Sequence, residues 1–172
     1  MKYLLVIAVV LIFAFAIISV MGMRLPKHHR VQNSAMITAS PMAVWAAISD
    51  VAAGPNWRSD LKRVDIIDSN RWREYDRHGN SVMFRLDSSQ PMHQRVASID
   101  DPGLPYSGSW TYTLNGDERG NTTVSIVEDA DVKSPVWRFF GHYVIGERSS
   151  IDRYLHDLQK SFEAGKSKSA QA

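Results

Sequence analysis

Residues 110–128 read WTYTLNGDERGNTTVSIVE, and this stretch decides the fold that the sequence predicts. It contains two runs with an apolar side chain at every second position: Trp110, Tyr112 and Leu114, then Val124 and Ile126. A period of two is typical of a β-strand with one face in a core. Asn-Gly and Gly-Asn pairs between the runs favour a hairpin loop. The stretch therefore predicts an antiparallel hairpin with one apolar face.

The same kind of pattern extends upstream and predicts further strands. Polar, Gly and Pro residues separate them at 77–80, 87–90 and 101–103, where turns are expected. The strands predicted outside the hairpin are 31–38, 64–67, 71–76, 81–86 and 92–99. Together with the hairpin they make seven antiparallel strands.

Two short helices are predicted between the first strand and the second. Ser40 can cap a helix and Pro41 suits its first position, so the first helix begins there. Gly54-Pro55 is expected to end it, and residues 56–61 are expected to form the second. The apolar contacts of the two helices are Val44, Trp45, Ile48, Trp57 and Leu61.

One long helix is predicted at the C-terminal end of the domain. Ser134-Pro135 repeats the helix-start signal, and Gly165 is a suitable stop. Gly141 and Gly146 each weaken a helix by about 1 kcal/mol relative to Ala. They indicate close packing or a bend, which we favour, or a hinge over a pocket.

The order of elements predicts how they pack. An antiparallel sheet cannot leave its concave apolar face in water, and the long helix is the predicted element able to cover it. We therefore expect an α+β, helix-grip fold, in which a seven-stranded sheet wraps around the C-terminal helix. A curved sheet that grips a helix leaves a cavity between the two.

The segment Leu4–Met23 has no charge, and Ser19 is its one polar side chain. Twenty helical residues span about 30 Å, the hydrocarbon thickness of a bilayer. A cleaved signal peptide is the alternative, with a cleavage site at Ala14-Phe15-Ala16. Cleavage there would leave the apolar residues 17–21 exposed at the new end. We therefore predict an uncleaved transmembrane anchor over residues 1–23.

Three basic residues follow the apolar segment: Arg24, Lys27 and Arg30. They predict a basic juxtamembrane linker at 24–30, and the positive-inside rule then favours a cytoplasmic position for the rest of the chain. The folded domain is predicted at 31–165. The polar tail KSKSAQA at 166–172 is expected to be disordered.

Composition argues against several classes of function. The 20 basic and 18 acidic residues nearly balance, and no basic run lies outside the linker, so we expect no nucleic-acid partner. The chain has no cysteine, no HExxH motif and no nucleotide-binding glycine loop. The pair Asp152 and His156 could share a helix face, but we interpret it as solvated surface. We expect neither a metal site nor a cofactor.

Six stretches carry a resemblance to a known family. They are ASPMAVW at 39–45, WRSDL at 57–61, RWREY at 71–75, DPGLP at 101–105, WTY at 110–112 and PVWRF at 135–139. With the element order, they make residues 31–162 resemble the START-like, helix-grip superfamily, specifically the polyketide cyclase/dehydrase-type SRPBCC proteins. The resemblance implies a container for lipids, hormones or polyketides. The family name alone does not imply cyclase activity, and the anchor is a departure from soluble cyclases.

Polar side chains are expected on the inner face of the sheet. Period two places Glu128 on the face of Ile126, and Tyr112 also inside. A two-residue loop after residue 76 would turn Arg73 and Tyr75 inward, whereas a three-residue loop would turn Trp72 and Glu74 inward. We favour Trp72 and Glu74, because an exposed Trp would leave a large apolar surface in water.

These placements yield a hypothesis about chemistry. Glu74, Glu128 and Tyr112 would form a polar cluster in an aromatic cavity, where paired carboxylates suit general acid–base work. Alternatively, Glu128 lies at the cavity mouth, in water or paired with Arg148 or Arg138. The predicted ligand-binding walls are Trp72, Phe84, Trp110, Tyr112 and Phe140.

The stretch 136–145 is too apolar for one helix face. It is either buried by the cavity and the short helices, which we favour, or exposed as a lip that touches the bilayer. The sequence as a whole predicts a membrane-anchored protein that binds a small hydrophobic ligand, lipid or polyketide-like. A cyclase/dehydrase-like enzyme and a non-catalytic assembly module with a self-filled cavity are the alternatives.

Overall fold

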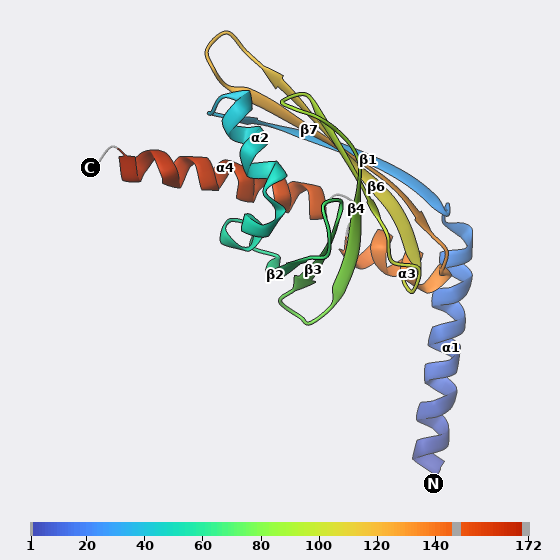
Figure 1. Cartoon of the computed structure of the whole chain (residues 1–172). Helices are drawn as coiled ribbons and strands as arrows, with labels where there is room; N and C mark the ends of the chain where they lie inside the picture. The colour runs from blue at the N-terminus through green and yellow to red at the C-terminus, as the bar shows by residue number, and fades with distance from the viewer. Residues whose placement is uncertain (1, 146–148, 170–172) are drawn as a thin grey trace.

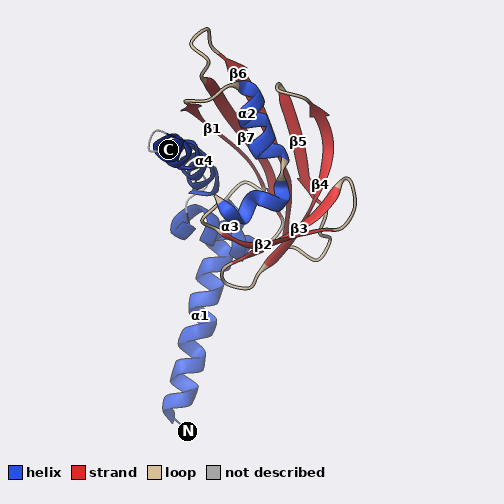
Figure 2. Ribbon diagram, turned by 60° about the vertical axis from the view of Figure 1, so that its left-hand side comes forward, coloured by secondary structure: helices blue, strands red, loops and turns tan. Residues whose placement is uncertain are grey.

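The predicted architecture is confirmed by the structure, a computed structural model that describes residues 2–145 and 149–169. Seven antiparallel strands form one sheet in the order β1-β7-β6-β5-β4-β3-β2, and helices lie against its concave face (Figures 1 and 2). The strands are β1 (His28–Ile37), β2 (Leu61–Ile66), β3 (Arg71–Asp76), β4 (Ser81–Gln90), β5 (Gln94–Ile99), β6 (Tyr106–Gly116) and β7 (Thr122–Val132). The helical elements are α1 (Lys2–Arg24), α2 (Pro41–Ser49), η1 (Val51–Asn56), α3 (Pro135–Phe140), η2 (Gly141–Ile145) and α4 (Ser149–Ser169).

The β6–β7 hairpin forms as its alternating pattern predicts. Tyr112 pairs with Ile126, and Leu114 pairs with Val124, so the apolar side chains share one face. All four are buried. The carboxylate of Asp117 accepts hydrogen bonds from the backbone of Arg119 and Asn121 and holds the loop. The hairpin supplies the centre of the hydrophobic core.

Helix α4 supplies the other half of the core. It crosses the concave face of the sheet, as Figure 1 shows, and buries the apolar side chains Ile151, Tyr154, Leu155 and Leu158. Helix α2 adds the buried side chains of Val44 and Ile48 to the same hydrophobic core. Ser40 caps α2 by accepting a hydrogen bond from the backbone nitrogen of Ala43, as predicted.

The second short helix was predicted at the wrong place. Gly54 and Pro55 lie inside the 3-10 helix η1 instead of ending α2, and β2 already begins at Leu61. Asp50 caps η1 through the backbone of Ala53, and the carbonyl of Gly54 accepts from both Trp57 and Arg58. Because a 3-10 turn of this kind uses few backbone donors, Pro55 is compatible with it. Residues 57–60 are therefore a connection, not a helix.

Two strands are longer than predicted. β1 begins at His28, so residues 28–30 of the expected linker belong to the sheet and pair with β7. β4 continues through the expected turn at 87–90, with a register shift between Leu86 and Ser88. The turn comes later and includes Met92, whose φ is 62°. Residues 87–90 are polar because this end of β4 is exposed.

The single C-terminal helix of the prediction is broken. α3 ends at Phe140, a π-helical turn η2 follows from Gly141, and α4 starts at Ser149; Gly146 lies outside the described residues. The interpretation of Gly141 as a bend agrees with its position at this break. α4 also runs past Gly165 to Ser169, so the predicted helix stop and the tail boundary at 166 are wrong.

The break also changes what surrounds the apolar stretch 136–145. Its preferred burial is wrong, because four of its side chains are exposed: Trp137 (50%), Phe140 (37%), Tyr143 (55%) and Val144 (65%). α3 lies beside the C-terminal end of α1, away from α2 (Figures 1 and 2). The stretch is thus an exposed aromatic lip next to the apolar helix.

α1 extends from the domain as an apolar rod (Figure 1). Among the described residues it is the helix whose length and hydropathy would allow it to cross a membrane, with 23 residues and none of its apolar window buried. These properties fit a membrane span and equally an N-terminal signal sequence. Only its end touches the domain: a β-carbon at Gly22 would overlap the carbonyl of Pro135. Arg138 adds a 2.7 Å hydrogen bond to the carbonyl of Leu25.

Candidate functional site

A cavity lies between the sheet, α2 with η1, and α4. This inner cavity has a volume of about 70 Å³, and its walls include Trp57, Trp72, Arg95, Tyr112 and Tyr154. It adjoins a wider outer hollow of about 450 Å³, which reaches Leu104, Tyr106 and Trp137. Four residues line both spaces and form the boundary between them: Arg58, Glu74, Phe84 and Trp110.

Aromatic rings form much of the inner wall. Tyr154 of α4 contacts Trp110 and Tyr112 of β6, with centroid distances of 5.8 and 5.5 Å. Trp72 stacks on Phe84 at 5.8 Å across the β3–β4 pair. Rings in these arrangements offer apolar surface with fixed geometry. The walls are therefore suited to an apolar or aromatic guest.

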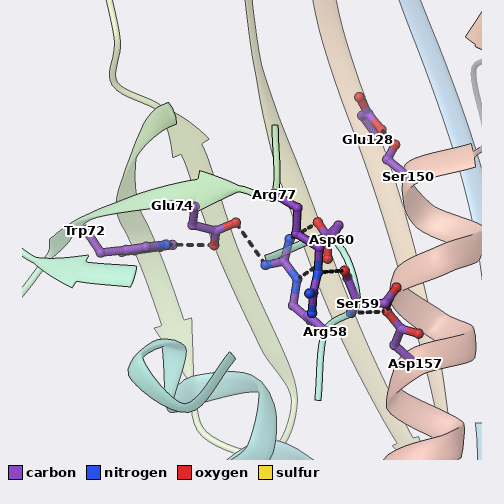
Figure 3. A network of polar contacts seen from close by, with 9 residues as sticks. All are labelled: Arg58, Ser59, Asp60, Trp72, Glu74, Arg77, Glu128, Ser150 and Asp157. Carbon is purple, nitrogen blue, oxygen red and sulfur yellow. Dashed lines mark hydrogen bonds and ion pairs between the residues drawn. The ribbon is translucent and has the colours of Figure 1, made fainter. Parts of the chain in front are cut away.

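Arg58 sits at this boundary with two carboxylate partners (Figure 3). Its guanidinium donates to Glu74 at 2.9 Å and to the two oxygens of Asp60 at 3.2 and 2.7 Å. The indole nitrogen of Trp72 donates to the other oxygen of Glu74 at 3.0 Å. Burial opposes the charge of Arg58, but Glu74 and Asp60 outweigh it and raise the arginine's pKa above its ordinary value. Arg58 is thus a fully compensated cation.

Hydrogen bonds hold this segment against its neighbours. The backbone and hydroxyl of Ser59 both donate to Asp157 of α4 at 2.7 Å. Arg77, in the β3–β4 loop, donates to the carbonyl of Ser59 at 2.6 Å. These bonds fix residues 57–60 between the loop and α4, as Figure 3 shows. They keep Arg58 at the boundary between the two spaces.

Arg95 lies deeper in the inner cavity, and only 6% of its surface is exposed. Its guanidinium lies 4.9 Å from the ring centre of Trp72 and 6.0 Å from that of Tyr112. Within the described ranges, no hydrogen bond or salt bridge joins its side chain to another residue. Burying an ion costs several kcal/mol, whereas a desolvated cation–π contact returns about 2 kcal/mol. Arg95 therefore retains unused capacity to donate.

The two buried tyrosines face the same cavity. Burial raises the pKa of Tyr112 to about 12 and also raises that of Tyr154, although Arg58 and Arg95 act in the opposite direction. Both phenols are therefore protonated at neutral pH and can donate hydrogen bonds. The inner cavity combines an apolar wall with neutral donors and one uncompensated guanidinium.

Comparison with known proteins agrees with this architecture. Residues 28–163 match the family described as polyketide cyclase / dehydrase and lipid transport. The chain belongs to this family. A search of curated proteins finds no match.

Solved structures share the fold. A START superfamily protein from Mycobacterium smegmatis superposes with a TM-score of 0.67 at 15% identity, covering 79% of this chain and 98% of that one. The Zhui aromatase/cyclase from a Streptomyces species gives 0.69 at 14% identity, covering 79% and 94%. A conserved protein from Geobacillus kaustophilus gives 0.63 at 14%, covering 79% and 96%.

In this polyketide cyclase/dehydrase family member, four of the five predicted wall residues line the inner cavity: Trp72, Phe84, Trp110 and Tyr112. The β3–β4 register pairs Trp72 with Phe84 and Glu74 with Val82, which turns Trp72 and Glu74 inward as expected. Phe140 does not line the cavity, and its predicted place is wrong. The break at Gly141 leaves Phe140 on α3, outside the cavity, whereas an unbroken helix would have carried it across the sheet.

The cluster of Glu74, Glu128 and Tyr112 does not form. Glu74 and Tyr112 share the inner cavity, but Glu128 lines a separate hollow near His29 (Figure 3). Glu128 accepts a 3.3 Å hydrogen bond from Ser150, and burial raises its pKa. The proposed partner Arg138 donates to Leu25 instead. The other proposed partner, at position 148, lies outside the described residues.

Sequence reasoning missed Arg58 and Arg95. The alternation in β5 contained a signal for Arg95, because Arg95 and Ala97 share one face and both are buried. Pairing places Arg95 opposite the inward-facing Tyr112. For Arg58 the sequence offers no periodic signal, since it lies in an irregular connection. Among the described residues, no group of three His, Asp or Glu side chains is placed to hold a metal.

Proposed function

We propose that this protein is a membrane-anchored binding protein for a small hydrophobic ligand. The observation that supports it best is the pair of adjacent spaces, an aromatic inner cavity and a larger outer hollow, between sheet and helices. Their sizes suit a small molecule whose end enters the inner cavity and whose body fills the outer hollow. The family description includes lipid transport, which agrees with such a ligand.

Binding accounts for the cavity better than catalysis does. A general acid–base pair needs a carboxyl group free to exchange a proton with substrate. Both oxygens of Glu74 are already used by Arg58 and Trp72, and Glu128 lies elsewhere. The open space also disfavours an assembly module with a self-filled interior. The cyclase/dehydrase alternative would need Tyr112 or Tyr154 as its proton donor.

The anchor is proposed to be uncleaved, with the domain on the cytoplasmic side. The close approach of Gly22 to Pro135 and the bond from Arg138 to Leu25 make the end of α1 part of the folded domain. Arg24 and Lys27 follow the span and favour the cytoplasmic side. Cleavage after Ala16 would keep Gly22 on Pro135 but would leave the exposed apolar side chains of Ile17 and Val20 at the new end.

The aromatic lip at 137–144 is proposed to lie in the bilayer interface. It adjoins α1, and Trp and Tyr side chains prefer the level of the lipid headgroups. Trp137 also lines the outer hollow. The hollow would then open toward the membrane, where an apolar ligand dissolves.

Two experiments test these proposals. Mass spectrometry of organic extracts from the purified full-length protein should find an apolar small molecule, absent from extracts of the same detergent alone.

In nanodiscs with brominated lipids, tryptophan emission should be quenched, and Trp137→Phe should remove most of that quenching. Trp45→Phe is the matched control, because α2 lies at the far end of the domain from α1 (Figure 1). Equal quenching in Trp137→Phe and wild type would refute the interfacial lip.

A further inference from the structure

The inner cavity holds a positive charge that the described part of the chain does not neutralise. Arg95 lines the cavity, is almost fully buried, and has the rings of Trp72 and Tyr112 near its guanidinium but no hydrogen-bond or salt-bridge partner for it among the described residues. The nitrogens of its guanidinium are not among the fully buried unpartnered atoms of the described residues, so they face the open space of the cavity. A cation held there, away from bulk water, is stabilised by an acceptor in that space. A ligand can supply the missing acceptor.

Arg58 and Arg95 differ in their partners. Both arginines line the same cavity, but Arg58 is bonded to Glu74 and Asp60. The other ionisable groups that line it are Asp50, whose carboxylate caps η1, and the two tyrosines. Each of the two acidic groups that line the inner cavity is therefore already engaged, and Arg95 is the cation left over among the described residues.

We propose that Arg95 binds the acidic group of an amphiphilic ligand, a carboxylate or comparable oxyanion attached to an apolar body. This inference rests on the proposed binding function and names its ligand class. The planar guanidinium can donate two parallel hydrogen bonds to a carboxylate, and such charge-assisted bonds are stronger than neutral ones. Tyr112 and Tyr154 line the same cavity and share a side-chain hydrogen bond, which leaves one of their two hydroxyls able to donate to the same group.

The sizes of the two spaces give the direction of binding. The inner cavity, about 70 Å³, admits a small polar group of a few heavy atoms, whereas the outer hollow of about 450 Å³ admits a larger body. Phe84 and Trp110 line both spaces, so we place the middle of the ligand beside these two rings. The acidic group therefore lies innermost, against Arg95, and the apolar body points toward the outer hollow and Trp137.

The test compares matched acidic and neutral probes on the full-length protein in nanodiscs. Isothermal titration calorimetry would use 2-naphthoate against 2-naphthamide and octanoate against octanamide, with empty nanodiscs as the blank. Arg95→Met should weaken binding of both acids by about tenfold or more and leave both amides within about twofold. Arg95→Lys keeps the positive charge but loses the two parallel donors of the guanidinium. Its affinity for the acids should therefore lie between that of the wild type and that of Arg95→Met.

Arg85→Met is the matched control, since Arg85 lies on the adjacent strand with its side chain half exposed and paired with Asp87. It should leave all four affinities unchanged. The melting temperature of Arg95→Met should not fall, because the variant removes a buried charge. If the wild type binds the amides as tightly as the acids, or if Arg95→Met weakens both classes equally, the inference about Arg95 is wrong and the binding function stands. If the wild type binds none of the four probes, both proposals fail together.

Discussion

Arg58 and Arg95 are two buried arginines of one cavity, and they differ in what surrounds them. Arg58 has two carboxylates and serves the fold, because it joins the 57–60 connection to β3. Within the described residues, Arg95 has contacts with aromatic faces but no carboxylate partner, and we propose that it is available to a ligand. At the scale of single residues, the two arginines differ in whether carboxylates neutralise their charge. Arg58, which has such partners, stabilises the fold, and Arg95 is the one that we propose to bind ligand.

The structural role of the Arg58 pair can be measured. Glu74→Gln should lower the free energy of unfolding by on the order of 3 kcal/mol, because it leaves a buried cation with less compensation. Asp65→Asn breaks the exposed Arg63–Asp65 pair on the neighbouring strand and should cost less than about 1 kcal/mol. Denaturant unfolding of both variants provides the comparison. Equal effects would show that the Glu74 pair is no stronger than a surface pair.

Glu128 should make stability depend on pH. Burial raises its pKa in the folded state above the ordinary value of 4.5, so its protonated form favours folding. Its contribution is fully present below pH 4.5 and is lost as the pH rises through the raised folded pKa. Glu128→Gln mimics the protonated form and should be more stable than the wild type at pH 7. Melting temperatures across pH 4–8 would test this; a wild-type advantage at pH 7 would contradict it.

At the scale of elements, the contact between α1 and α3 links the apolar helix to the domain. Gly22→Leu should separate them, because the added side chain overlaps Pro135. Arg138, now buried and bonded to Leu25, should then become a site of rapid tryptic cleavage. Val20→Leu, at an exposed position two residues away, should leave cleavage slow. Rapid cleavage in the wild type would mean that the contact does not persist.

The elements also show what the sequence could and could not predict. The hairpin 110–128 was predictable because its buried residues repeat with the period of a strand. The break after Phe140 was not, because the apolar residues continue on both sides of Gly141 and a propensity penalty of about 1 kcal/mol does not by itself end a helix. Arg95 was missed because a charged residue inside a strand suggests solvent. The tertiary pairing with Tyr112, not the local pattern, places it in the cavity.

At the scale of the whole molecule, the apolar helix, the aromatic lip and the outer hollow follow one another in space. α1 packs on α3, and Trp137 of α3 lines the outer hollow. Ligand from the bilayer would therefore have a short path past the lip toward Arg95. If α1 is the membrane anchor that we propose, it would hold the cavity next to the bilayer, in which an apolar ligand dissolves.

The most direct test of the binding account fills the cavity and asks whether ligand is lost. Ala47 lines the inner cavity, and its neighbour Ala46 faces solvent on the same helix. Native mass spectrometry of the full-length protein should show a ligand-bound species in the wild type and in Ala46→Phe. Ala47→Phe should fold with a similar melting temperature and lose that species. Equal occupancy in both variants, or a wild type that carries no ligand, would contradict the account.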